Sequence, residues 1–282
     1  RSVTVGGKSR RGEPRPFLSK SRVRIGSPIS ALPFPALDRI AARAPESAAM
    51  GTNASGWKSR PLLRAIAVRL SRWRQRARFR GSQAYWDQRY RAGDDSGAGS
   101  YGNLAALKAE VLNGLVREGG VRSVIEFGCG DGAQLALADY PAYLGLDVSA
   151  AVLDRCRARF AGDGTKRFAL YTPDFPRDLP GVTRADLALS IDVLYHLVEE
   201  DIFIRHLRDL FGAADRMVVI YSSDFDREEP VPHVRHREFT AWVAANIPGW
   251  SRVRRIPNRF PYRPEDGSGS LADFHVYERE DR

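Results

Sequence analysis

A short glycine-rich segment, "VIEFGCGDGAQL" at residues 124–135, restricts the fold of this chain more than any other feature. A run of apolar residues ends near an acid, and glycines follow at Gly128, Gly130 and Gly132. Glycine is needed where a side chain would block close approach to the backbone, or where φ is positive. A loop of this kind between a strand and a helix presents free N–H groups and the positive end of a helix dipole. The segment therefore predicts a site for a nucleotide-like ligand.

Two ligand classes fit this loop. The letters "GCGDGA" satisfy the dinucleotide pattern G-x-G-x-x-[GA], and Asp147 lies 19 residues after Gly128, near the expected ribose-binding acid. Glu126 separates the two classes, because a carboxylate two residues before the first glycine would repel a pyrophosphate. A ligand with a cationic head, carrying an amino group and a sulfonium, is favoured there instead.

The hydrophobic pattern after Gly81 alternates strands with helices, which predicts an α/β fold with a mostly parallel sheet covered on both faces. A helix is expected directly after the glycine loop, and another begins at a Ser149 cap. The other expected helices lie near 104–118, 199–212 and 237–247. The expected strands lie at 122–127, 142–147, 167–170, 185–191, 216–222, 250–256 and 272–278.

The pattern E-x-G-x-G-x-G is typical of class I S-adenosylmethionine-dependent methyltransferases, and the chain resembles that family from about residue 83 to its end. "GLDVS", "YTPDFPRDLP" and "ADLALSIDVLYHLVEED" agree with it, because each lies at the carboxyl end of an expected strand. The resemblance implies a Rossmann-like sheet with an antiparallel C-terminal strand, and S-adenosyl-L-methionine as cofactor. It also implies that Asp147 binds the ribose hydroxyls and Asp174 the adenine amino group, with Phe175 beside the ring. Asp178 is a rival for the role of Asp174.

A closer resemblance joins "YWDQRYRAGDDSGAGSYGNLAALKAEVLNGLV" and the segment from "HVRHREF" to "SLADFHVYE" to a bacterial subset of these enzymes. That subset acts on small-molecule or glycan-linked acceptors that are not defined. It implies that the "GAGSYG" loop with Tyr101 closes over the donor, whereas a flexible linker is the alternative. The cofactor-binding residues expected from pattern and resemblance are Glu126, Gly128, Gly130, Asp131, Gly132, Asp147, Asp174, Phe175 and Tyr101.

Candidates for the chemistry follow the fourth and fifth expected strands. A hydroxyl acceptor must lose its proton, and histidine or a carboxylate is the usual base. His196 and Asp192 are the catalytic candidates, since a spacing of four would place them on the same side of a helical turn. The acceptor-binding candidates are Tyr195, His233, Arg235 and His236. The alternative for His196 is that it packs beside the adenosyl group or caps a helix. The alternative for His233, Arg235 and His236 is a solvated charged loop. The sequence shows no metal-binding cluster.

The positive charge of the chain is confined to its N-terminal part. Residues 1–82 carry a net charge of +16 and the remainder −6. Residues 1–49 have the composition of a disordered extension, and Met50 raises the hypothesis that they are not native. Residues 50–82 are expected to form a basic helical arm whose 61–80 stretch has one apolar stripe. This arm is a candidate for membrane-surface or nucleic-acid contact, whereas 83–282 form the methyltransferase domain.

These features favour a cytoplasmic enzyme that methylates a hydroxyl or carboxylate of a small molecule or saccharide. No apolar run is long enough for a transmembrane helix, and two cysteines suit a reducing compartment. Two alternatives remain open at this point: an RNA or protein methyltransferase that uses the arm, and an NAD-dependent oxidoreductase. The acidic body makes nucleic acid the weaker partner.

Overall fold

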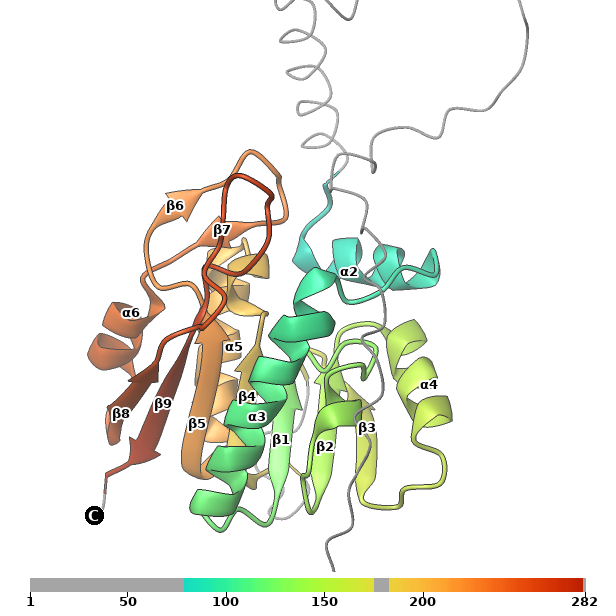
Figure 1. The fold of residues 1–282 in the computed structure, drawn as a ribbon, viewed down its shortest axis with the longest axis vertical. Coiled ribbons are helices and arrows are strands. Elements are labelled where there is room, and N and C mark those ends of the chain that lie inside the picture. Colours follow the sequence, from blue (N-terminus) through green and yellow to red (C-terminus); the bar gives the residue numbers. More distant parts are fainter. Residues whose placement is uncertain (1–78, 175–182, 281–282) are drawn as a thin grey trace, which may run out of the picture. The chain divides into compact units, whose positions relative to one another are not determined.

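The computed structural model describes residues 79–174 and 183–280. Its main feature is a sheet of seven strands in the order β3-β2-β1-β4-β5-β9-β8 (Figure 1). The first five strands in chain order are parallel, β9 runs antiparallel to β5, and β8 runs antiparallel to β9. The sheet strands are β1 (Val124–Phe127), β2 (Tyr143–Asp147), β3 (Lys166–Leu170), β4 (Ala185–Ile191), β5 (Ala214–Ser222), β8 (Trp250–Ile256) and β9 (Asp273–Arg279).

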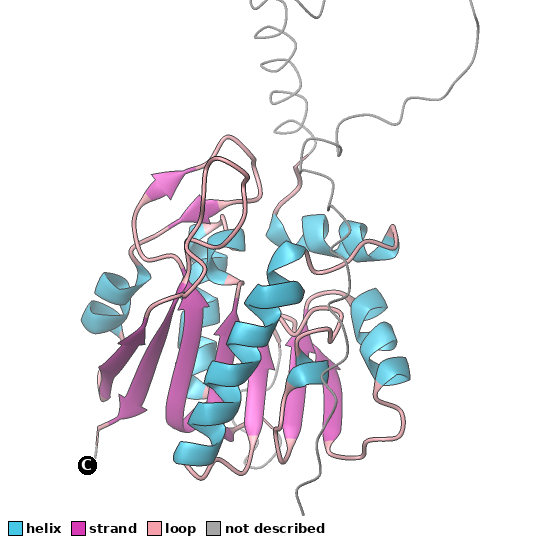
Figure 2. Cartoon of the chain, viewed as in Figure 1, coloured by secondary structure: helices cyan, strands magenta, loops and turns pink. Residues whose placement is uncertain are grey.

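Helices cover both faces of this sheet, as the alternating pattern predicts (Figure 2). α3 and α4 lie in front of the sheet in the view of Figure 1, and α5 lies behind it. A small second sheet pairs β6 (Arg227–Glu228) with β7 (Arg235–His236). The α-helices are α2 (Ser82–Arg91), α3 (Gly102–Glu118), α4 (Ala150–Arg159), α5 (Glu200–Gly212) and α6 (Phe239–Asn246). The 3-10 turns are η2 (Ala98–Ser100), η3 (Leu135–Leu137) and η4 (Leu194–His196).

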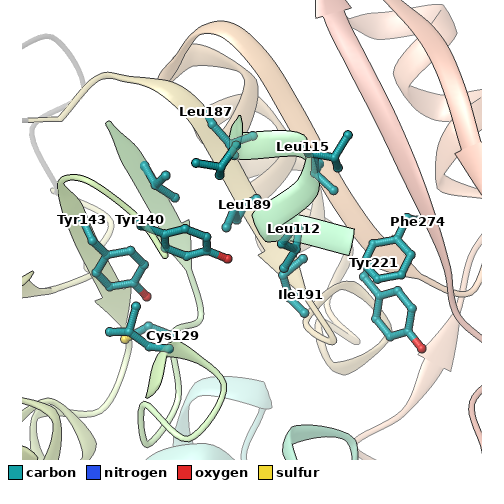
Figure 3. Close-up of a cluster of buried hydrophobic side chains, with 14 of the residues drawn as sticks. Leu112, Leu115, Cys129, Tyr140, Tyr143, Leu187, Leu189, Ile191, Tyr221 and Phe274 are labelled. Carbon is teal, nitrogen blue, oxygen red and sulfur yellow. The ribbon is translucent and has the colours of Figure 1, made fainter. Parts of the chain in front are cut away.

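The core has two halves because every central strand is buried on both sides. All seven residues of β4 are buried, which explains its nearly continuous apolar sequence. On one face, Leu112 and Leu115 of α3 pack against Leu187 and Leu189 of β4 (Figure 3). On the other face, α5 and α6 cover the alternate residues of the same strands. The fold prediction is confirmed, including the antiparallel strand at the C-terminus.

The helix expected directly after the glycine loop is absent, and this prediction was wrong. The chain makes only the short turn η3 before it reaches β2. Asn113 of α3 explains the difference, because its amide donates to the Leu137 carbonyl at 3.0 Å and accepts from Asp139 N–H at 2.9 Å. These bonds occupy backbone groups that an α-helix would have used. The glycine loop therefore has no helix dipole behind it.

Two local predictions also need correction. Ser149 is at the N-cap position of α4, but its hydroxyl donates to Asp87 Oδ1 at 2.9 Å and caps no backbone N–H. Asp192 and His196 do not share a helical turn, because Asp192 has a φ of +60° and η4 begins only after it. The extension at residues 1–49, most of the arm at residues 50–82, Phe175 and Asp178 lie outside the described residues.

Candidate functional site

A cavity opens at the carboxyl ends of β1, β2 and β4, where open α/β sheets bind ligands. Its empty volume, counted with its opening to solvent, is about 1110 Å³. Seven of the residues singled out from the sequence line it: Glu126, Gly128, Gly130, Asp131, Asp147, Asp192 and His196. The other described candidates do not line it: Tyr101, Gly132, Asp174, Tyr195, His233, Arg235 and His236. The fold thus brings together the loop after β1, the end of β2 and the loop after β4.

The glycine loop forms the floor of this cavity. Gly128 has a φ of +86° and Gly130 a φ of +56°, so both adopt the left-handed region that favours glycine. A Cβ on Gly128 would lie 2.5 Å from a methyl group of Val193. The loop therefore has no room for side chains at these positions, and its backbone remains accessible from the cavity.

Asp147 ends β2 and fixes the loop from the side. Its Oδ2 accepts from Gly130 N–H at 3.0 Å, and its Oδ1 accepts from Ser149 N–H at 3.1 Å. Burial raises the pKa of Asp147 to about 6, although hydrogen bonds from Ser149, Gly130 and Val148 lower it. A buried carboxylate that faces a cavity is well suited to bind hydroxyl groups or a cation.

Glu126 is the second buried carboxylate of the cavity, with 5 % of its surface exposed. Its Oε2 accepts from the Tyr143 hydroxyl at 2.5 Å. Burial raises the pKa of Glu126 to about 7, against the lowering effects of the Tyr143 hydrogen bond and the Lys108 charge. A bound cation would favour the ionised form of Glu126, so this position suits a cationic ligand group.

Lys108 is a charged residue of the cavity that the sequence interpretation missed. It lies on the buried face of α3, and its Nζ donates to Asp192 Oδ2 at 2.6 Å. Tyr195 donates its hydroxyl to the other oxygen of Asp192, at 2.8 Å. The available signal was a lysine on the apolar face of a helix, four residues before Leu112 and seven before Leu115. Asp192 is consequently held by two donors, and its left-handed φ is fixed by tertiary contacts.

His196 lines the cavity beside Trp86 of α2. The two rings make an edge contact with centroids 4.9 Å apart. Nδ1 of His196 is 3.1 Å from the His233 carbonyl oxygen. Burial lowers the pKa of His196 to about 4; the His233 hydrogen bond and Asp192 raise it, whereas the charges of His233 and Arg89 lower it. His196 is therefore neutral at physiological pH.

The segment before α3 is attached to the glycine loop through Asp131. Oδ2 of Asp131 accepts from the Tyr101 hydroxyl at 2.7 Å and from Ser96 N–H at 3.1 Å. In return, Asp131 N–H donates to Ser96 Oγ at 2.9 Å. Burial raises the pKa of Asp131, but the hydrogen bonds from Tyr101, Ala133 and Ser96 lower it further, so the net shift is downward. The "GAGSYG" loop is thus bonded to the cavity floor.

Three of the residues expected to bind the acceptor do not line the cavity: His233, Arg235 and His236. Arg235 is 3.4 Å from Glu200 Oε2, and His236 is 2.6 Å from Ser223 Oγ and 3.3 Å from Glu229. His233 stacks on Tyr85, with ring centroids 4.2 Å apart. These contacts attach the β6–β7 segment to α2 and α5, and acceptor binding by the three residues stays a prediction.

Comparisons with known proteins define the class of this site. Residues 125–213 match a family model described as a methyltransferase domain. The N-methyltransferase NodS from Bradyrhizobium japonicum, crystallised with S-adenosyl-L-homocysteine, is similar in fold with a TM-score of 0.55, at 16% identity over 71% of this chain and 100% of NodS. No curated protein matches the chain in sequence.

Two further structures are similar with a TM-score of 0.49. One is the methyltransferase domain of bacterial CtHen1, at 22% identity over 64% of this chain and 100% of that domain. The other is the Synechocystis magnesium protoporphyrin IX methyltransferase with bound donor, at 16% identity over 72% of this chain and 99% of that enzyme.

The fold and the family match agree with each other. Residues 125–213 match a methyltransferase domain, and the described residues have the fold of the methyltransferase NodS. The match favours methyl transfer over the oxidoreductase alternative. Within the described ranges, no helix has the length and apolar character to cross a membrane. Within the same ranges, no three His, Cys, Asp or Glu side chains are grouped to hold a metal ion.

Proposed function

We propose that this enzyme transfers the methyl group of S-adenosyl-L-methionine to a small-molecule or saccharide acceptor in the cytoplasm, at a hydroxyl or a carboxylate. The observation that carries the proposal is the pair of buried carboxylates, Glu126 and Asp147, beside a loop that admits no side chain at Gly128 and Gly130. A ligand with a ribose and a cationic amino-acid end matches this pair. Both cysteines of the chain are free thiols, which suits a reducing compartment.

In this proposal, each end of the donor has its own partners. Asp147 binds the ribose hydroxyls, Glu126 binds the amino group, and the ammonium of Lys108 attracts the carboxylate. Asp174 binds the adenine amino group, with Phe175 beside the ring. The N–H groups of the glycine loop, with Gly132 shaping the turn and Asp131 holding Tyr101, complete the cradle.

When bound, S-adenosyl-L-methionine supplies an activated methyl group. The protein's own contribution is positioning and exclusion of water. Trp86, His196 and Leu197 line the cavity, and in this proposal the acceptor binds beside them. Lys108 and Tyr195 orient Asp192.

Calorimetric titration of the full chain with S-adenosylmethionine, S-adenosylhomocysteine and NAD⁺ tests the donor. We expect the two adenosyl-sulfur ligands to bind and NAD⁺ not to bind. Asp147→Asn should abolish binding, whereas Asp139→Asn, a change at a carboxylate with 75% of its side chain exposed, should leave it unchanged. Binding of NAD⁺ alone, or equal binding by Asp147→Asn, would contradict the proposal.

A second candidate acceptor is RNA, or a protein, bound through the N-terminal arm. Its support is the net charge of +16 over residues 1–82. Filter binding of single-stranded RNA across a salt series distinguishes it. Affinity that falls steeply with salt, together with methylated RNA as product, would favour this candidate over a small-molecule acceptor.

A further inference from the structure

The hydrogen bond of His196 determines which of its ring nitrogens faces an acceptor as a lone pair. A carbonyl oxygen has no hydrogen to donate, so the 3.1 Å contact between His233 O and Nδ1 requires a proton on Nδ1. In a neutral imidazole the other nitrogen then carries a lone pair. No residue that the structure describes donates to Nε2 of His196. The ring lines the cavity, so Nε2 is an unused hydrogen-bond acceptor in the cavity wall.

The surroundings of His196 hold it in this neutral form. Trp86 of α2 covers the ring, and the Tyr195 ring contacts it with centroids 4.5 Å apart. The ring of His233, in the loop before β7, has its centroid 5.9 Å from that of His196. The guanidinium of Arg89 disfavours a second cation nearby, while Asp192 acts in the opposite direction but is already paired with Lys108. Since burial also disfavours the charged form, Nε2 presents a lone pair to whatever enters.

We propose that the methylated atom of the acceptor carries a hydrogen that it donates to Nε2 of His196, so the substrate is an alcohol, a phenol or an amine and not a carboxylate. This inference rests on the proposed function, because it concerns the second ligand of the same cavity. An O–H or N–H group can donate its hydrogen to the Nε2 lone pair. The lone pairs of the acceptor oxygen or nitrogen then point away from the imidazole ring. A carboxylate would place lone pairs against the Nε2 lone pair.

Two of the cations near the cavity already have partners on aspartates. Lys108 is bonded to Asp192, and Arg89 is bonded to Asp95 through Nε and Nη2. Arg205 also lines the cavity, and its Nε is buried without a partner.

The chemistry is consistent with a weakly basic imidazole. As the acceptor oxygen or nitrogen bonds to the methyl carbon, the carbon–sulfur bond breaks, its electron pair remains on sulfur, and the acceptor proton passes to Nε2. An oxygen that has just been methylated while protonated is strongly acidic, so even a base of low pKa removes its proton. The imidazolium then returns the proton to water.

Nuclear magnetic resonance of the full, ¹⁵N-labelled chain saturated with S-adenosylhomocysteine tests this proposal. Histidine side-chain spectra report which ring nitrogen carries the proton, and His196→Gln assigns the resonance. The probes are phenol, aniline and benzoate, which share one ring and differ in the group presented. We expect a proton on Nδ1, and a shift of Nε2 with phenol or aniline but not with benzoate. His206 is the internal control, because its Nε2 is 2.9 Å from Ser190 Oγ.

Three results would overturn the proposal: a proton on Nε2, a shift of Nε2 with benzoate, or no shift with any of the three probes. Methyl esters as reaction products would also overturn it. Failure of the proposed function is recognised separately, because S-adenosylhomocysteine would then not bind in calorimetry. The tautomer of His196 can be read in the ligand-free chain in either case.

Discussion

Nζ of Lys108 lies 2.6 Å from Oδ2 of Asp192, and this ion pair joins α3 to the loop that follows β4. The lysine side chain is 1% exposed and the aspartate side chain 17%. Replacing either partner alone leaves the other charge largely desolvated. Each of the two charges therefore depends on the other at the place where the cavity is formed.

Lys108→Met should lower the free energy of unfolding by about 3 kcal/mol, since it leaves Asp192 without its cation. The double variant Lys108→Met/Asp192→Asn should recover most of this loss, because it removes both charges. Urea denaturation of the full chain measures both. Arg117→Met is the matched control, because its pair with Asp139 is 4.0 Å long and exposed, and it should change stability by less than about 1 kcal/mol. Equal losses for the single and double variants would contradict this account.

Glu126→Gln should stabilise the ligand-free protein above neutral pH. Burial raises the Glu126 pKa from 4.5 to about 7, so the unfolded chain gives up this proton more readily than the folded one. The native protein thus loses stability as pH rises from 4.5 to about 7, by up to about 3 kcal/mol. Glutamine keeps an oxygen for the Tyr143 hydroxyl and avoids this loss. Thermal unfolding across that range should show a difference that grows with pH and then levels off.

The same substitution should weaken donor binding. The native affinity for S-adenosylmethionine is expected to rise as pH increases through about 7, because only the ionised carboxylate of Glu126 attracts the amino group. Glu126→Gln should remove this dependence. Calorimetry at about one pH unit on either side of that value checks it. An unchanged pH dependence in the variant would assign the effect to another group, with Asp147 the first alternative.

Gly128→Ala should abolish donor binding and destabilise the protein by about 1–3 kcal/mol, since a non-glycine residue would be strained at a φ of +86° and would contact Val193. Gly114→Ala is the control. Gly114 lies within α3, and a Cβ there would meet nothing closer than Glu118 Oε1 at 4.0 Å. That change should raise stability by about 0.5–1 kcal/mol. Chemical denaturation measures the stability of both variants, and titration measures their donor binding. Donor binding by Gly128→Ala equal to that of the native chain would contradict the prediction.

Tyr101→Phe should loosen the loop that precedes α3, because Asp131 loses the hydroxyl at 2.7 Å. The cost to global stability should be only about 1 kcal/mol, since Tyr101 is 42% exposed. Hydrogen exchange of residues 96–101 should become faster, and the pKa of Asp131 should rise. Tyr262→Phe, at a tyrosine with similar exposure, should change neither.

The strands and most helices could be predicted from the sequence because their apolar patterns are local. The buried run of β4 and the amphipathic α5 are examples. The turn η3 could not be predicted, because Asn113, which captures its backbone groups, lies more than twenty residues away in the chain. Local helix propensity was overridden there by tertiary hydrogen bonds.

In the candidate site too, residues set by local pattern could be predicted and contacts between distant residues could not. Glu126, Gly128 and Asp147 could be predicted because they lie at strand ends, whose positions follow from the sheet topology. The ion pair of Lys108 with Asp192 could not, since it joins residues that are 84 positions apart. His196 and His233 were both singled out, but only the structure shows that one orients the other through its carbonyl.

The bonds between Asp131 and the segment around Ser96 have a consequence for local unfolding. Three hydrogen bonds join this segment to the glycine loop, and all of them involve Asp131. When one segment detaches, the other loses its support, so the two should open as one cooperative unit. Amide exchange should therefore report a common opening free energy for residues 96–101 and 130–131, although about thirty residues separate them in the chain.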